Sequence, residues 1–298
     1  MVLNRFTSTL LLVLATIFWG FAFVAQKNAM AHMEPLTFIG ARYLLGGLVV
    51  LPLGLWEMRR RGRRLTRRQW LLVGFLSFNF FIGSWLQQEG LLFTTVTNGG
   101  FLTGLYVFSV PVILLIVVRT PPHVIVWICV PLALAGLYLL HGASLDRLNF
   151  GDTLIIISSV FWGVHVLMLG WLARDTGMPI LISAISFLAA GLAATGGAFV
   201  LETPTFEVLS LGWAEIAYTG VMSTAVAFTL QAVGQMHVPP ANAAIILSGE
   251  TLFAALGGAV VLGERLAPAG YAGAAMIFAA IVLVETVPVL QTRRQPAG

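Results

Sequence analysis

The sequence predicts an all-α membrane protein whose ten transmembrane helices form two inverted five-helix repeats. Two observations predict this fold class. Only 9% of the 298 residues are charged, against about 25% in a soluble domain, and 58% are hydrophobic. The chain also matches itself when it is shifted by about half its length. So few charges cannot cover the surface of a soluble fold, which excludes soluble enzymes, DNA-binding domains and disordered proteins.

Ten apolar stretches are each long enough to form a membrane helix. A helix needs about 20 mostly apolar residues to cross about 30 Å of hydrocarbon. The stretches are continuous, whereas strands of a membrane barrel alternate apolar and polar residues. We expect the helices at residues 8–28, 35–57, 70–89, 96–118, 123–141, 151–172, 179–201, 211–234, 241–262 and 268–288. No hydrophilic segment between them is long enough to fold separately, so any function is expected within the bundle.

The first stretch is expected to remain as a helix of the mature protein. Ala29-Met30-Ala31 follows it and resembles a cleavage site, but the stretch spans about 20 residues and a signal peptide has an apolar core of about 7–15. The single cysteine, Cys129, excludes a disulfide framework and a cysteine-rich metal site.

The basic residues predict the orientation of the chain, because they collect on the cytoplasmic side of short loops. With the N-terminus inside, most of the 16 Lys and Arg lie inside, many of them in the run from Arg59 to Arg68. The outer side holds only Lys27, Arg147 and Arg265. We therefore expect an integral plasma membrane protein, in bacteria the inner membrane, with both termini in the cytoplasm. We interpret the arginine run as a topology anchor in contact with anionic membrane lipids, and not as a nucleic-acid site.

An internal duplication accounts for the self-similarity. Phe18-Trp19-Gly20 falls on Phe161-Trp162-Gly163, and further matches in the same register are Pro35 with Pro179, Leu86-Gln87 with Leu230-Gln231, Gly90 with Gly234, and Asn98 with Asn242. We divide the chain into a first repeat at residues 1–145 and a second at residues 146–298. Five helices are an odd number, so the second repeat must enter the membrane from the opposite side. Inverted repeats are typical of transporters that carry a midplane site between two halves and open it to either side in turn.

The pattern resembles the drug/metabolite transporter superfamily, specifically its EamA-type members with ten helices. The resemblance rests on the two Phe-Trp-Gly segments, on Arg42, and on the best-matching region, which runs from Leu247 through Glu250 and Ala254-Ala255 to Leu262-Gly263-Glu264-Arg265-Leu266 and Tyr271-Ala272-Gly273. One departure is plain: the family's Gly-Glu at the end of the fourth helix is replaced by Val117-Val118-Arg119-Thr120. The resemblance implies export of small metabolites, above all amino acids, by alternating access. Bacterial aromatic-amino-acid exporters are the most similar type in length and style.

A carboxyl group in the middle of the ninth helix is the first candidate site residue. Glu250 would cost about 2.5–3.5 kcal/mol in hydrocarbon without a cavity, a partner or a proton. The repeat places Tyr106 opposite Glu250, as it places Asn98 opposite Asn242, and we expect Tyr106, Glu250 and Asn98 to contact substrate. The alternative for Glu250 is a structural residue that is protonated or paired with Arg42.

Aromatic and amide side chains supply the other candidates. Trp19 and Trp162 lie about ten residues into their helices, too deep for interface anchors, so they belong either to the core or to a cavity wall. His165 shares a helical face with Trp162 and is either a proton carrier or a hydrogen-bonded interior residue. Gln87, Gln88 and Gln231 are candidates as well, although such residues also bond helices to one another.

Other function classes lack their signatures. The sequence contains no Gly-Lys-Ser/Thr phosphate-binding motif, no His-Glu-x-x-His and no aspartate in the middle of a span, so we expect no catalytic residue, metal or cofactor and no direct use of ATP. We predict a secondary carrier, either proton-coupled through Glu250 or His165 or facilitative. An exporter of drugs or organic cations is the alternative within transport; a channel or an intramembrane enzyme is the alternative from another class.

Overall fold

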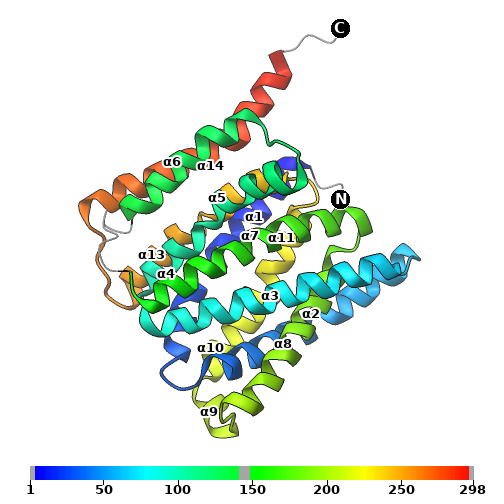
Figure 1. Ribbon diagram of the computed structural model, residues 1–298, viewed down its shortest axis with the longest axis vertical. Coiled ribbons are helices and arrows are strands. Elements are labelled where there is room, and N and C mark those ends of the chain that lie inside the picture. The colour runs from blue at the N-terminus through cyan, green and yellow to red at the C-terminus, as the bar shows by residue number, and fades with distance from the viewer. Residues whose placement is uncertain (1–3, 141–147, 295–298) are drawn as a thin grey trace.

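The protein was analysed as a computed structural model that describes residues 4–140 and 148–294. These ranges are helical with no strand, and their helices occupy the ten predicted stretches (Figure 1). The single-helix spans are α1 (Arg5–Ala29), α2 (Pro35–Arg61), α3 (Arg67–Phe93), α6 (Val124–Leu140), α7 (Phe150–Thr176), α8 (Pro179–Leu201) and α14 (Pro268–Arg294). The fourth span consists of α4 (Val96–Gly104), α5 (Tyr106–Ile113) and the π-helix η1 (Leu114–Val118). The eighth consists of α10 (Trp213–Tyr218), the π-helix η2 (Thr219–Phe228) and α11 (Thr229–Gly234), and the ninth of α12 (Pro240–Leu247) and α13 (Glu250–Val261).

The lengths of these helices suit a membrane. In the described ranges nine spans are long and apolar enough to cross one, and α6, with 17 residues, is shorter. A short helix, α9 (Phe206–Leu211), precedes the eighth span. The predicted all-α fold is therefore confirmed. The predicted repeat boundary between residues 145 and 146, the end of the fifth stretch at 141 and Arg147 lie outside the described residues.

Local sequence explains where the helices begin and end. α2 and α8 both start with a proline, Pro35 and Pro179, which suits the first helical position because its missing N–H would have no intrahelical partner there. α3 begins with a capping box between Thr66 and Gln69. α2 runs past its predicted end at residue 57, because arginine is a good helix former, and stops at Gly62, whose φ is 60°.

Close antiparallel packing joins the two repeats. Gly40 near the start of α2 lies against Thr195 near the end of α8, and Gly54 near the end of α2 lies against Leu181 near the start of α8. The two helices are therefore antiparallel. α3 packs on α7 in the same way, and α6 on α14. Figure 1 shows α6 and α14 side by side at one edge of the bundle and α2 and α8 at the opposite edge. Small residues permit these approaches because they let the backbones come close.

The contacts between the repeats are related by a two-fold axis. α3 against α7 has its counterpart in α1 against α11 and η2, and α3 against α8 has its counterpart in α2 against η2. Gly90 of α3 lies against Ile155 and Gly151, and Gly234 lies against Leu12 and Ser8 in the repeat-related place. The fourth and ninth spans pair with each other, the first half of one (α4) on the second half of the other (α13). This arrangement is an inverted repeat, as predicted.

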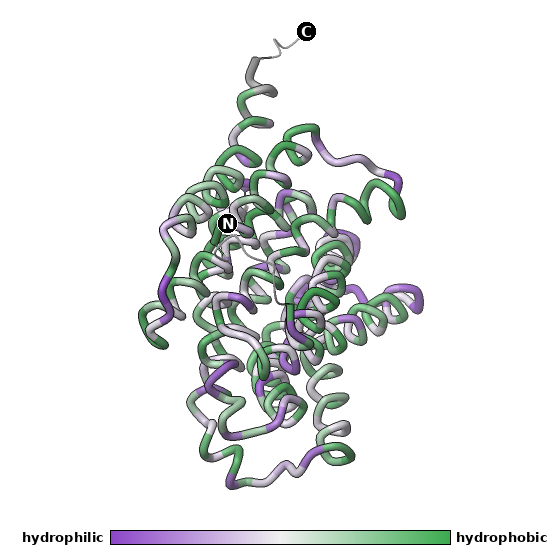
Figure 2. The backbone as a smooth tube through the Cα atoms, turned by 60° about the vertical axis from the view of Figure 1, so that its left-hand side comes forward, coloured by the Kyte–Doolittle hydropathy of each residue, from purple (hydrophilic) through white to green (hydrophobic). Residues whose placement is uncertain are grey.

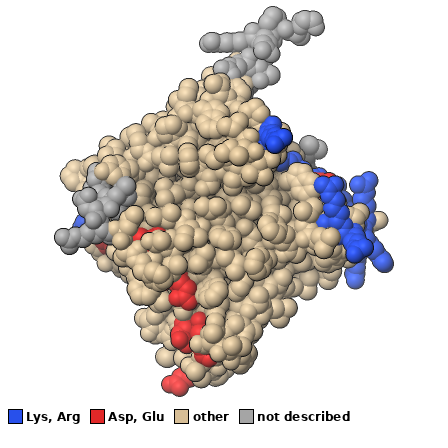
Figure 3. Space-filling model, in the orientation of Figure 1, with Lys and Arg blue, Asp and Glu red and all other residues tan. Residues whose placement is uncertain are grey.

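Charge separates the two ends of the bundle. Figure 3 shows Lys and Arg gathered at one end and Asp and Glu towards the other. We call the end with the exposed arginines between Arg59 and Arg68 the basic end, and the end with Glu34, Glu202 and Glu207 the acidic end. Figure 2 shows hydrophobic residues along the helices between them. Large apolar side chains such as Val200, 80% exposed, face outward, as expected of a surface in contact with lipid.

Two spans are interrupted in the middle, at positions related by the repeat. The fourth span turns at Leu105, after Gly104, and the ninth turns at Ser248–Gly249. At each turn the backbone bonds three residues back, with Leu105 N–H donating to Leu102 O at 3.3 Å and Gly249 N–H to Ile246 O at 3.1 Å. Tyr106 and Glu250 each follow an interruption directly. Interrupted helices near the midplane are typical of transporter binding sites.

Candidate functional site

A cavity lies between the two repeats, beside the interruptions of the fourth and ninth spans. Its volume is ≈ 50 Å³, enough for a few water molecules. Every side chain that lines it is buried, none more than 8% exposed. The cavity therefore lies inside the bundle, away from its outer surface.

Most of the cavity wall is built from residues that the repeat relates to one another. Five such pairs line it: Trp19 with Trp162, Phe23 with Val166, Gln87 with Gln231, Thr103 with Leu247, and Tyr106 with Glu250. The two-fold axis thus passes through the cavity. Six further residues have no lining counterpart: Gln26, Arg42, Tyr43, His165, Ser223 and Phe228. The duplication shapes the space, and these unmatched residues make its two halves chemically different.

Arg42 places a cation in the cavity without a carboxylate partner among the described residues. It lies on α2, is 3% exposed, and donates from Nη2 to the Tyr43 hydroxyl at 3.1 Å. Its guanidinium lies 5.1 Å from the centre of the Phe38 ring and 4.6 Å from that of Tyr43, within cation–π range. The Nε atom has no hydrogen-bond partner among the described residues. The Tyr43 hydroxyl continues the chain of bonds to Ser84 Oγ at 2.6 Å.

Glu250 places a carboxyl group in the same cavity. It begins α13, is 5% exposed, and has the Tyr106 hydroxyl as its hydrogen-bonding neighbour. The alternative in which Arg42 pairs with Glu250 is not observed, because no ion pair joins them in the described part of the chain. Arg42 instead contacts Tyr43 and Phe38, and Glu250 contacts Tyr106. One cation and one acid therefore share the cavity without neutralising each other.

The two repeat-related tryptophans differ in their hydrogen bonding. Trp19 Nε1 donates to the backbone oxygen of Ser223 at 3.1 Å. Ser223 lies in the π-helix η2, where the wider turn changes the backbone bonding. The counterpart of η2 in the first repeat is the regular α-helix α3, and Trp162 Nε1 has no partner among the described residues. A difference in helix type thus breaks the symmetry of an otherwise matched pair.

Seven of the nine predicted site residues line the cavity: Trp19, Gln87, Tyr106, Trp162, His165, Gln231 and Glu250. The other two lie elsewhere. Gln88 points away from the cavity and donates to Gln26 O at 3.2 Å, because adjacent residues of a helix face different directions. Asn98 lies one turn into α4 near the acidic end and donates to Thr94 Oγ1 and Asp152 Oδ1, both at 2.6 Å.

The analysis of the sequence did not include nine of the sixteen cavity residues among its site candidates: Phe23, Gln26, Arg42, Tyr43, Thr103, Val166, Ser223, Phe228 and Leu247. Arg42 entered the sequence analysis as part of the family resemblance and as a partner for Glu250, although an arginine inside an apolar stretch is itself a signal of a site. Gln26, at the end of the first stretch, was a weaker one. Tyr43, Ser223 and Phe228 carry no such signal, since ordinary core residues look the same in a sequence.

Carboxylates tie helix ends together at both ends of the bundle. At the acidic end Glu202 accepts from Leu36 N and Thr37 N, both at 2.7 Å. At the basic end Glu57, its repeat-related counterpart, accepts from Ile180 N and Leu181 N, both at 3.0 Å. Each therefore satisfies the free N–H groups at the start of the opposing helix, α2 or α8.

The fourth and ninth spans are tied by such a carboxylate at the acidic end only. Glu264 accepts from Val96 N and Thr97 N, both at 3.1 Å, and from the Thr97 hydroxyl. Thr120 occupies the repeat-related position at the basic end and has no carboxyl group. This is where the sequence departs from the Gly-Glu pattern.

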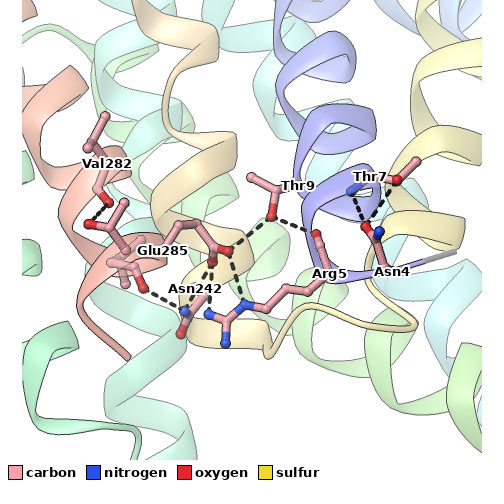
Figure 4. Close-up of polar contacts among 9 residues, drawn as sticks. Asn4, Arg5, Thr7, Thr9, Asn242, Val282 and Glu285 are labelled. Atoms are coloured by element: carbon pink, nitrogen blue, oxygen red, sulfur yellow. Dashed lines mark hydrogen bonds and ion pairs between the residues drawn. The ribbon is translucent and has the colours of Figure 1, made fainter. Parts of the chain in front are cut away.

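A different set of contacts joins α1, α12 and α14 at the basic end (Figure 4). Arg5 forms an ion pair with Glu285, with Nε to Oε2 at 3.1 Å. Thr9 donates to Glu285 Oε2 at 3.0 Å, and Asn242 Nδ2 donates to Oε1 at 3.2 Å. The Glu285 carboxylate thus holds three helices together between the cavity and the basic end.

The sequence pattern of the EamA-like transporter family matches residues 7–142 and again residues 149–286. The chain belongs to this family. The two matches to the same family pattern correspond to the two five-helix repeats of the fold. This EamA-like protein is therefore a membrane transporter.

Relatives of this EamA-like transporter agree over nearly its whole length. It is 31% identical to an uncharacterized transporter of Archaeoglobus fulgidus, over 95% of this chain and 87% of the relative. It is 27% identical to the uncharacterized transporter YwfM of Bacillus subtilis, over 97% of each, and 25% identical to the inner membrane transporter YedA of Escherichia coli K12, over 90% and 87%. A crystal structure at 16% identity superposes with a TM-score of 0.76 and covers 98% of this chain and all of its own, which establishes likeness of fold.

Proposed function

We propose that this EamA-like transporter is a secondary exporter of amino acids, working by alternating access, with its basic end in the cytoplasm. The observation that carries the proposal is that Arg42 and Glu250 share one buried cavity, neither of them in an ion pair with any described residue. An amino acid is a zwitterion and supplies the two opposite charges that these side chains lack. Binding it would leave neither protein charge uncompensated, which hydrocarbon surroundings strongly favour.

Each charged group of the substrate has a suitable receptor. The guanidinium of Arg42 presents a planar fork of donors that matches a carboxylate, and its Nε is free among the described residues. The ammonium group goes to Glu250, beside the Tyr106 hydroxyl. The two tryptophans, Trp19 and Trp162, form aromatic walls and do not require an aromatic cargo.

Coupling to protons follows from a competition at Glu250. With no substrate in the cavity, the carboxyl has no cationic partner in the described structure, so a proton neutralises it. An incoming ammonium group must displace that proton. Because the proton and the substrate exclude each other at Glu250, each amino acid that moves outward is exchanged for a proton that moves inward. The proposed mechanism uses no cofactor.

A second candidate, export of organic cations, is favoured by one feature of the cavity. A carboxyl beside tryptophan and phenylalanine rings would also suit a cation without a carboxylate. Arg42 opposes it, since a cationic substrate would leave the arginine unpaired.

The decisive experiment is counterflow in proteoliposomes with three sets of compounds: amino acids, the amines that lack the carboxylate, and the acids that lack the ammonium group. We expect exchange of amino acids only. Exchange of amines alone would replace the proposal with the organic-cation alternative. Uptake that shows no acceleration by trapped substrate would indicate a channel.

Substitution of the two charged residues tests their separate roles. Arg42→Gln should weaken amino-acid binding by about 10- to 100-fold, the effect of about 1.5–3 kcal/mol for a charge-assisted hydrogen bond, and should reduce the disadvantage of amines. Glu250→Gln should abolish the dependence of exchange on pH. The exposed residues Arg63 and Glu207 provide matched controls, and Arg63→Gln and Glu207→Gln should change neither property. A pH profile of Glu250→Gln identical to that of wild type would contradict the coupling role.

A further inference from the structure

Five cavity residues keep buried polar atoms without partners among the described residues: Gln26, Arg42, Trp162, His165 and Gln231. The indole Nε1 of Trp162, both ring nitrogens of His165 and Oε1 of Gln231 make no well-formed hydrogen bond within the described residues, although the His165 and Gln231 side chains lie near enough to interact with each other. Their side chains are 8%, 2% and 1% exposed. An unpaired buried polar atom costs about 1–3 kcal/mol, and the large majority of such atoms in native proteins are paired. Four of them lining one cavity therefore indicate groups that a ligand satisfies.

Aromatic packing restricts the rings of His165 and Trp162. The His165 ring lies 5.1 Å from Phe80, 5.7 Å from Trp162 and 5.8 Å from Phe228, measured between ring centres. Trp162 stacks on Phe228 at 5.8 Å. The donors and acceptors are thus held in place before any ligand arrives, an arrangement that lowers the entropic cost of binding.

His165 and Gln231 lie nearer the basic end of the bundle than Arg42 does. His165 follows Trp162 by one helical turn towards the basic end of α7, and Gln231 lies on α11 in the half of the eighth span nearer that end. Arg42 lies on the half of α2 nearer the acidic end. A molecule held by Arg42 and Glu250 would therefore extend its side chain towards Trp162, His165 and Gln231.

We propose that Trp162, His165 and Gln231 form a subsite for a neutral side chain that both donates and accepts hydrogen bonds, such as a hydroxyl or a carboxamide. Trp162 Nε1 only donates, Gln231 Oε1 only accepts, and a neutral imidazole offers one donor and one acceptor. Neither an acid nor a base completes this set, and an aliphatic side chain satisfies none of it. The inference rests on the proposed amino-acid export and specifies which amino acids the cavity selects.

The subsite predicts discrimination between side chains of nearly equal size. A site built to bond a polar group rejects the analogue that lacks it, because its own polar groups then stay unpaired. We test this with counterflow of two pairs, threonine with valine and glutamine with methionine. The wild-type protein should favour the polar member of each pair by about 10- to 100-fold.

Two substitutions and one matched control assign the preference to the subsite. Gln231→Met and Trp162→Phe should reduce the preference towards one. Gln87→Met alters the repeat-related glutamine in the same cavity, whose Nε2 already bonds Thr103 Oγ1 at 2.8 Å. This control should lower exchange without changing the preference between pair members. A preference that survives both Gln231→Met and Trp162→Phe overturns the subsite.

The possible failures are distinguishable. If no amino acid exchanges, the proposed function is wrong; if valine and methionine exchange as well as threonine and glutamine, only the subsite is wrong. Thermal unfolding without substrate adds a readout independent of transport. Gln231→Met removes an unpaired buried oxygen and should melt at or above the wild-type temperature. Melting well below it, or failure to fold, would mean that the protein itself pairs this oxygen, which overturns the inference.

Discussion

Single residues that break the repeat symmetry give the cavity its chemistry. For Arg42 and His165, the repeat-related residue does not line the cavity. For Glu250 it does, but that residue is a tyrosine, Tyr106. A cavity with two identical halves would bind a symmetric ligand best. An amino acid has different groups at its two ends, so a site for it requires departures from symmetry at individual positions.

The two tryptophans permit a test of symmetry breaking at the residue scale. Trp19→Phe removes the bond to Ser223 O and should lower the free energy of unfolding by about 0.5–1.5 kcal/mol. Trp162→Phe removes an atom with no partner among the described residues and should lower it by less. Unfolding of the two variants in the same detergent checks the order. Equal losses in the free energy of unfolding would mean that the hydrogen bond from Trp19 to Ser223 O contributes no net stability.

Close helix approach makes certain glycines indispensable. A Cβ added at Gly20 of α1 would lie 2.6 Å from Phe253 C and 2.7 Å from Ala254 N of α13, so Gly20→Ala should cost about 1–3 kcal/mol through overpacking. Gly74 on α3 has no atom within 4 Å of an added Cβ, and Gly74→Ala should be neutral or stabilising because alanine favours helix. Thermal unfolding of both variants tests the contrast. Similar melting temperatures would contradict the packing of α1 on α13.

At the scale of helices, carboxylate contacts join one pair of helices at both ends and another pair at one end only. α2 and α8 are held at both ends by Glu57 and Glu202. The fourth and ninth spans are held by Glu264 at the acidic end, and the equivalent position at the basic end is Thr120. We therefore expect the fourth and ninth spans to separate during transport, with Glu264 keeping the acidic end closed between cycles.

The role of Glu264 can be measured by access to the cavity. In a Cys129→Ala background, Thr103→Cys places a thiol on the cavity wall. Glu264→Gln weakens the acceptor for Val96 N and Thr97 N and should increase labelling of that thiol from the acidic end several-fold. Glu202→Gln, which weakens the matching contact on α2, should leave the labelling rate unchanged. Equal effects of the two substitutions would show that Glu264 has no special part in closure.

At the scale of the whole molecule, the inverted repeat explains how one site can serve both sides of the membrane. The two halves pack around a two-fold axis through the cavity, so any opening towards one end has a geometrically equivalent opening towards the other. The Glu285 cluster lies towards the basic end, and the Glu264 contacts lie towards the acidic end.

Orientation in the membrane is a property of the whole molecule and can be tested directly. In the Cys129→Ala background, Thr203→Cys at the acidic end should react with an impermeant maleimide in intact cells. Arg63→Cys at the basic end should react only after the membrane is permeabilised. The positive-inside bias is the physical reason for this expectation. The opposite pattern would reverse the proposed direction of export while leaving the fold intact.

The amino-acid sequence by itself determined the number of helices, their approximate ends and their inverted arrangement. Hydrocarbon demands about 20 apolar residues per helix, and a duplicated unit of five helices leaves only one topology. It also singled out seven of the sixteen cavity residues, because polar and aromatic side chains deep in apolar stretches are costly or unusual there and indicate a site. Gln88 does not line the cavity, and the sequence could not separate it from Gln87 because the rotation of the helix is not known from the sequence. Asn98 does not line it either, because its match to Asn242 gives the register of the repeat and not the depth of the residue in the membrane.

Only the tertiary structure decided which polar groups meet and which remain unpaired. That Arg42 contacts Tyr43 and not Glu250, that a π-helix offers Ser223 O to Trp19 and not to Trp162, and that Glu264 caps the fourth span all depend on contacts between segments far apart in the chain. Hydropathy and repeats indicate whether each residue prefers an apolar or an aqueous environment. They do not record its neighbours, and in this transporter the chemistry of the cavity depends on those neighbours.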